Sequence, residues 1–186
     1  MVFGAVLEVA HTLEGWGEFY VVVGAAAAAL TGLMFVVIAL RAEDSQRSVE
    51  RFEAFATPTL VAFSTVLVLS ALATVPKHSE TSLGVSLVLS GIAGAIYTCY
   101  NTRQVQREDG YTYMSDWAWR HVAPGLDYVA LFVAGIVVWI DDALALYMLG
   151  AAAMVMLFIG VHNAWDTAVW IAADHREDEG ESDSSE

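Results

Sequence analysis

The sequence predicts an all-α membrane protein, a polytopic bundle of five transmembrane helices. Hydrophobic residues make up 57% of the 186-residue chain and the mean hydropathy is +0.54, whereas ordinary soluble domains are about 45–50% apolar. Five apolar segments are each long enough to cross ~30 Å of hydrocarbon at ~1.5 Å per residue. Their connections are short, so we expect one domain over residues 16–173.

Polar or aromatic residues bound each predicted span. Trp16 precedes the first span and Arg41 follows it, as is typical of residues at a membrane interface. Pro58 opens the second span, where its missing N–H costs nothing in the first helical turn. Trp119 precedes the fourth span, and Asp141-Asp142 separates it from the fifth. The predicted spans cover residues 18–40, 58–75, 82–100, 121–140 and 143–171.

Two terminal segments lie outside the predicted spans. Residues 1–15 contain acids but no basic residue, so they lack the positively charged start of a secretory signal. Their apolar residues fall near helical spacing, which predicts a helix along the outer membrane surface. Residues 174–186 are mostly acidic and polar, and we expect them to form a solvated, disordered tail.

The basic residues predict the orientation. If the amino terminus lies outside, the outer connections carry only Lys77, and the cytoplasmic side carries the other seven basic residues: Arg41, Arg47, Arg51, Arg103, Arg107, Arg120 and Arg176. Cytoplasmic connections of membrane proteins are enriched in Lys and Arg. We therefore expect a multi-pass protein of the cytoplasmic membrane, with its carboxyl terminus in the cytoplasm.

Composition and motifs exclude several functions. The net charge is −14, which argues against nucleic-acid binding because that function requires a basic face. The single Cys99 lies in an apolar segment and cannot form an internal disulfide. No His-Glu-x-x-His, Gly-x-Ser-x-Gly or phosphate-loop motif occurs. We expect no metal and no cofactor. The lipid bilayer is the one partner implied, and the sequence does not identify a protein partner.

Small residues recur every fourth position in two of the spans. Such residues let a neighbouring helix approach closely, because van der Waals contact drives helix association in lipid. We expect the two stripes to pack against each other inside the bundle, and a seam between subunits of a homo-oligomer is the alternative. The residues are Gly24, Ala28 and Gly32 in the first span, and Ser86, Ser90 and Gly94 in the third.

Polar residues within the last two spans form the candidate site. His162 and Asp166 are four residues apart and share one helix face with Asn163. Asp127 lies about 9 Å into the fourth span at ~1.5 Å per residue, where an unpaired carboxylate costs up to about 2.5–3.5 kcal/mol. Asp127 lies toward the cytoplasmic end of the fourth span, and the other three residues lie toward the cytoplasmic end of the fifth. We therefore predict that Asp127 lies beside His162, with Asn163 and Asp166 in the same pocket.

Three interpretations of this cluster remain open. The groups can hold the last two helices together in a structural or regulatory membrane component, which is the interpretation we prefer. Alternatively, they form a proton or cation site in a small transporter or channel, although no span has the broken helix typical of transporters. The third interpretation is an intramembrane metal enzyme. His162 and Asp166 supply only two ligands for it, and His121 or Asp127 would have to complete the set.

Two segments resemble a widespread group of small, uncharacterised prokaryotic multi-pass membrane proteins. They are the segment from Trp16 to Val36, with its Gly-Ala-Ala-Ala-Ala-Ala run, and the segment from Phe158 to Asp166. The His162-Asn163-Ala164-Trp165-Asp166 run is the more specific of the two. The resemblance covers most of residues 16–172 and implies the same helical membrane fold. It implies no activity and no catalytic residues.

Overall fold

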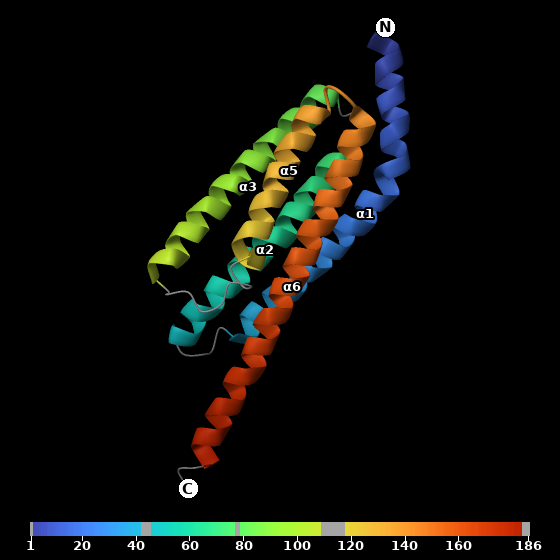
Figure 1. Cartoon of the computed structure of the whole chain (residues 1–186). Coiled ribbons are helices and arrows are strands. Elements are labelled where there is room, and N and C mark those ends of the chain that lie inside the picture. The colour runs from blue at the N-terminus through green and yellow to red at the C-terminus, as the bar shows by residue number, and fades with distance from the viewer. Residues whose placement is uncertain (1, 42–45, 77–78, 109–117, 184–186) are drawn as a thin grey trace.

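The computed structural model describes residues 2–41, 46–76, 79–108 and 118–183, and within these ranges the chain forms helices and no strand (Figure 1). A short π-helix, η1, runs directly into α5, so the two cross the bundle as one unit. The helices are α1 (Val2–Arg41), α2 (Gln46–Ala73), α3 (Glu80–Glu108), η1 (Ala118–Val122), α5 (Ala123–Val137) and α6 (Asp142–Asp183).

Five of the described segments are long and apolar enough to cross a membrane, as predicted. Their bounds lie within a few residues of the expected spans, and each segment begins slightly earlier than expected. The segments are Gly15–Ala39, Ala56–Ala73, Glu80–Arg103, Ala118–Val137 and Asp142–Val169. The chain is therefore a multi-pass membrane protein with an all-helical fold.

Helix α6 lies at the centre of the bundle, where it packs against α1, α2 and α5 (Figure 1). Helix α1 packs mainly against α2, and α3 packs mainly against α5. Fully buried side chains such as Tyr20, Leu69, Leu131 and Leu149 fill the space between these helices. The two termini lie at opposite ends of the molecule, as an odd number of spans requires (Figure 1).

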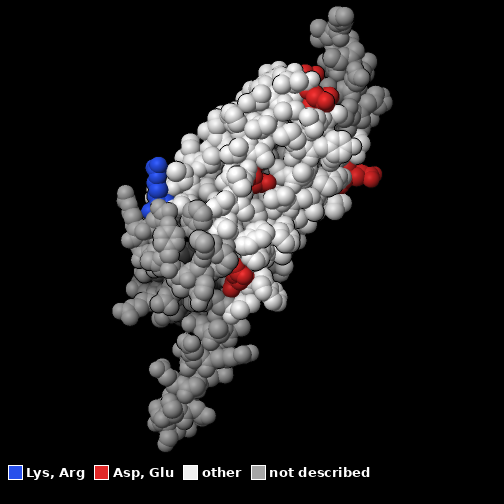
Figure 2. All heavy atoms as spheres, viewed as in Figure 1, with Lys and Arg blue, Asp and Glu red and all other residues white. Residues whose placement is uncertain are grey.

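Charged side chains are sparse on the bundle surface. Figure 2 shows acidic atoms at the upper end, at the right edge, at one spot in the middle of the face and near its lower end, and basic atoms at the left edge. Most of the surface between them is uncharged. Many large apolar side chains on this surface are exposed, including Leu33, Leu89 and Ile96, each at least 60% accessible. An exposed apolar surface of this extent is expected where lipid tails, and not water, surround the protein.

The small residues of the third span pack against α5, so the expected pairing of the two stripes was wrong. A Cβ added to Gly94 would overlap the ring of Tyr128, and one added to Gly91 would lie 2.7 Å from the backbone nitrogen of Phe132. Ser86 and Ser90 are half-buried beside them, and the Ser90 hydroxyl donates to the Ser86 carbonyl at 2.8 Å. Spacing alone predicted a small-residue stripe, but the large aromatic residues of α5 selected its partner.

Only part of the small-residue stripe in the first span packs against another helix of the chain. Gly24 is buried against Ser70 of α2, whose Cβ would lie 2.8 Å from an added Cβ. Ala28 and Gly32 are exposed, and a Cβ added to Gly32 would meet nothing within 4 Å. A seam between subunits at Ala28 and Gly32 stays a prediction.

Both terminal segments continue the helices of the adjoining spans. Helix α1 starts at Val2, so residues 2–15 are helical and are joined to the first span without a break. That this segment lies along the outer membrane surface stays a prediction. Helix α6 extends to Asp183, so residues 174–183 are helical and the prediction of a disordered tail was wrong there. The reason is local: no Gly or Pro interrupts residues 161–179, and the alanines there favour helix.

Candidate polar site at one end of the bundle

The carboxyl of Asp127 is buried near the start of α5. The side chain is 5% exposed, and its Oδ2 has no hydrogen-bond partner within the described part of the chain. Leu131 and Ala134, one and two turns further along, are fully buried. Asp127 therefore continues an otherwise apolar face that packs into the bundle, and no described cation neutralises it.

The backbone just before Asp127 is irregular. Pro124 occupies the first turn of α5, and the five residues Ala118–Val122 that precede it form the π-helix η1. Proline has no N–H, so a carbonyl of the preceding turn loses its usual donor. A π-helical turn is wider than an α-helical turn and is frequent at functional sites. The chain thus enters this span through a π-helical turn followed by a proline.

His162 and Asp166 form an ion pair on the outer side of α6. The His162 Nε2 lies 3.6 Å from the Asp166 Oδ2, and the two side chains are 34% and 32% exposed. The ring of Trp119 lies 4.7 Å from the His162 ring, centroid to centroid. Phe158, one turn earlier on α6, also contacts Trp119, at 5.9 Å between ring centroids. His162 and Asp166 are therefore half-exposed, and His162 has an aromatic neighbour from η1.

Asn163 points into the bundle. It is 4% exposed, and its Oδ1 has no hydrogen-bond partner among the described residues. The Thr167 hydroxyl donates to the backbone carbonyl of Asn163, one turn back, at 2.8 Å. This bond does not involve the side-chain amide of Asn163. Asn163 is the one residue of the His-Asn-x-Trp-Asp run whose buried polar atom faces a cavity.

The four predicted site residues do not form one hydrogen-bonded cluster. Within the described ranges, no hydrogen bond or ion pair joins Asp127 to His162, and the cavity beside Asn163 is not lined by Asp127, His162 or Asp166. Adjacent residues of a helix point about 100° apart, since there are ~3.6 residues per turn. His162 therefore faces Trp119, while Asn163 faces the interior.

The cavity lies between α2, α3, η1, α5 and α6, toward the end of the bundle where α3 ends and η1 begins. Its volume is about 20 Å³, enough for about one water molecule, which needs ~10–15 Å³. Apolar groups of Pro58, Met156 and Ile159 form part of its wall. Val61 and Ala62 of α2 and Pro124 and Tyr128 of α5 also line it. The other lining residues are polar: Tyr97, Thr98 and Asn101 from α3, Arg120 from η1, and Asn163 from α6.

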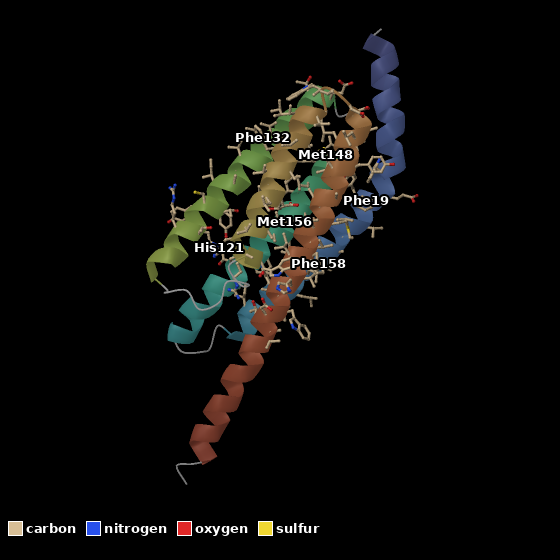
Figure 3. The ribbon with its side chains drawn as sticks, in the orientation of Figure 1. Phe19, His121, Phe132, Met148, Met156 and Phe158 are labelled. Carbon is tan, nitrogen blue, oxygen red and sulfur yellow. The ribbon has the colours of Figure 1, made fainter. Side chains whose placement is uncertain are left out.

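The α3 side of this site was not predicted from the sequence. Tyr97, Thr98, Asn101 and Thr102 share one helix face near the end of the third span, a pattern that helical spacing makes visible. The Thr102 Oγ1 lies 3.1 Å from the Nδ1 of His121, which is buried. His121 and Met156 mark the level of the site in Figure 3.

A second hydroxyl pair lies deeper in the bundle. The Tyr128 hydroxyl lies 3.0 Å from the Thr65 Oγ1, and Thr65 donates in turn to the Val61 carbonyl at 2.8 Å. Tyr128 also lines the cavity. The polar contacts of α5 therefore reach α2 through Tyr128 and α3 through the His121 of η1.

The described side chains place no three His, Cys, Asp or Glu residues close enough to hold a metal ion. His121, which sequence analysis considered as a third ligand beside His162 and Asp166, faces Thr102 instead. The ligand set required by the metal-enzyme interpretation is therefore not assembled in this part of the chain.

Comparison of the chain with protein-family models, with curated proteins and with solved structures gave no match. The resemblance to small prokaryotic multi-pass proteins stays a prediction.

Proposed function

We propose that this membrane protein handles protons, with Asp127 as the group that binds and releases them. The observation that carries the proposal is the buried Asp127 carboxyl, whose Oδ2 has no described hydrogen-bond partner in an apolar bundle. An ionised carboxylate in such a place is costly, so the neutral form is favoured until a donor or water approaches. A group with this property suits reversible protonation.

The interpretation preferred from sequence, a polar lock between the last two spans, is less well supported. A lock requires partners for the buried carboxyl, and no described group pairs with Asp127. The His162–Asp166 pair lies within a single helix and is about one-third exposed. Exposed pairs contribute only about 0–1 kcal/mol, so this pair does little to hold α5 and α6 together.

A structural or regulatory membrane component is the second candidate. The small size of the cavity, about 20 Å³, favours it, because a transporter site for a larger solute needs more space. In that function Asp127 would stay protonated and would not bind and release protons. A metal cation as substrate is disfavoured by the Arg120 side chain in the cavity wall.

The proposed setting is the cytoplasmic membrane, with the amino terminus outside. The support is the distribution of basic residues, seven on one side and one on the other. The cavity then opens toward the cytoplasm, because Asn101 and Arg120 flank the α3-to-η1 connection on that side.

Proton flux into proteoliposomes tests the proposal. A trapped pH-sensitive dye reports the internal pH while a potassium gradient with valinomycin sets the membrane potential. We expect the wild-type protein to carry protons and Asp127→Asn to reduce the rate at least tenfold. Asp166→Asn is the matched control and should leave the flux unchanged. It also removes an acid near this end of the bundle, but Asp166 is about one-third exposed and does not line the cavity. Equal flux in wild-type and Asp127→Asn vesicles would overturn the proposal.

A further inference from the structure

Two buried polar atoms beside the cavity lack hydrogen-bond partners among the described residues. They are the Tyr97 hydroxyl oxygen of α3 and the Asn163 Oδ1 of α6. Asn163 as a whole is 4% exposed, so bulk water does not reach it freely. The great majority of buried polar side-chain atoms in proteins have a partner, and ordered water is a common one.

The chemistry of these two atoms matches one water molecule. The amide oxygen of Asn163 can only accept a hydrogen bond, and the hydroxyl of Tyr97 can donate one. A single water can accept from Tyr97 and donate to Asn163 at the same time.

The size of the cavity also selects water. About 20 Å³ accommodates one water molecule and excludes a hydrated metal ion or an organic solute. Thr98, Asn101 and Arg120 line the side of the cavity toward the end of the bundle, and Met156 and Ile159 close its apolar side. The polar part of the wall therefore lies toward that end of the bundle.

We propose that this cavity is a water-binding site that bridges Tyr97 of α3 and Asn163 of α6 and supplies Asp127 with water from the α3-to-η1 end of the bundle. Pro124 and Tyr128, which line the cavity, lie within one turn of Asp127 on the same helix. The supply of protons to Asp127 by this route rests on the proposed function. The bridging water itself does not.

A structure of the full chain in a lipid nanodisc, at a resolution that reveals ordered water, tests the bridge. We expect a density peak within hydrogen-bond distance of both the Tyr97 hydroxyl and the Asn163 Oδ1. An empty cavity in a map that shows water at other buried polar groups would overturn the bridge, as would a direct bond between Tyr97 and Asn163.

Proton flux in proteoliposomes tests the route. We expect Tyr97→Phe and Asn163→Leu each to lower the flux at least fivefold while the proteins remain monodisperse and helical. Ser90→Ala is the matched control for Tyr97→Phe. It removes a hydroxyl from the same helix, and that hydroxyl bonds only to the backbone carbonyl of Ser86. Unchanged flux in both variants, together with loss of flux in Asp127→Asn, would overturn the route and leave the proposed function intact. Absence of flux in the wild-type protein would overturn the function and the route, while the map would still decide the water site.

Discussion

Gly94 of α3 lies against the ring of Tyr128 of α5, so closely that any Cβ at position 94 would overlap the ring. Tyr128 is 3% exposed, and its hydroxyl lies 3.0 Å from the Thr65 Oγ1. The missing side chain at position 94 therefore lets the ring lie flat between α3 and α5 and lets its hydroxyl reach α2. Tyr128 therefore contacts both α3 and α2.

Replacement of Gly94 by alanine tests the contact. We expect Gly94→Ala to destabilise the protein by about 1–3 kcal/mol, because extra atoms in a tightly packed site force neighbouring side chains to move. Gly32→Ala is the control, since nothing lies within 4 Å of an added Cβ there. Thermal unfolding in detergent, followed by circular dichroism, measures both. Equal unfolding temperatures for the two variants would contradict the close contact.

Tyr20 should stabilise the contact between α1 and α6 through one hydrogen bond. Its side chain is fully buried, and its hydroxyl donates to the Leu146 carbonyl at 3.1 Å. We expect Tyr20→Phe to cost about 0.5–1.5 kcal/mol, the usual value for one hydrogen bond. Tyr147→Phe removes the same hydroxyl from a side chain that is 64% exposed and should have no effect. A similar loss from both variants in detergent unfolding would argue against the Tyr20 bond.

Asp127 should be replaceable by an apolar residue without loss of stability. Its buried carboxyl has no described partner at Oδ2, so Asp127→Leu removes an unfavourable burial and leaves no other charge unpaired. We expect a free energy of unfolding that is unchanged or higher by about 1–3 kcal/mol. Chemical unfolding in mixed micelles provides the measurement. A loss of 3 kcal/mol or more, about the cost of breaking a buried pair, would indicate a structural lock.

The His162–Asp166 pair should contribute little to stability. Both side chains are about one-third exposed, and exposed ion pairs are worth about 0–1 kcal/mol. A double-mutant cycle with His162→Ala and Asp166→Ala isolates the coupling between the two residues. We expect a coupling free energy below about 1 kcal/mol from unfolding in detergent. A value of several kcal/mol would show that the pair is shielded from solvent in the membrane.

Cysteine labelling tests the orientation of the chain. Cys99 is first replaced by serine, and one cysteine is then introduced at Ser79, in the α2-to-α3 connection, or at Ser184, beyond α6. We expect a membrane-impermeant maleimide to label Ser79→Cys in intact cells and to label Ser184→Cys only after lysis. The reverse pattern would place the amino terminus inside and would direct the cavity outward.

The sequence by itself determined the number of spans and their approximate bounds. Hydropathy and length are properties of each segment alone, and a helix that crosses lipid must satisfy its backbone hydrogen bonds within itself. The same local geometry determined that His162 and Asp166 share a face, and the structure has them 3.6 Å apart. Local geometry also made residues 174–183 helical, although their charge suggested disorder.

Only the tertiary structure decided how the helices are rotated and which of them are neighbours. A repeat of small residues shows that some helix packs closely, but it carries no information about which one. The bulky Tyr128 and Phe132 made α5 the partner of α3. The rotation of α6 then directed Asn163 inward toward Tyr97 and left His162 beside Trp119. These choices depend on how large and small side chains from several helices fit together, and no single segment contains that information.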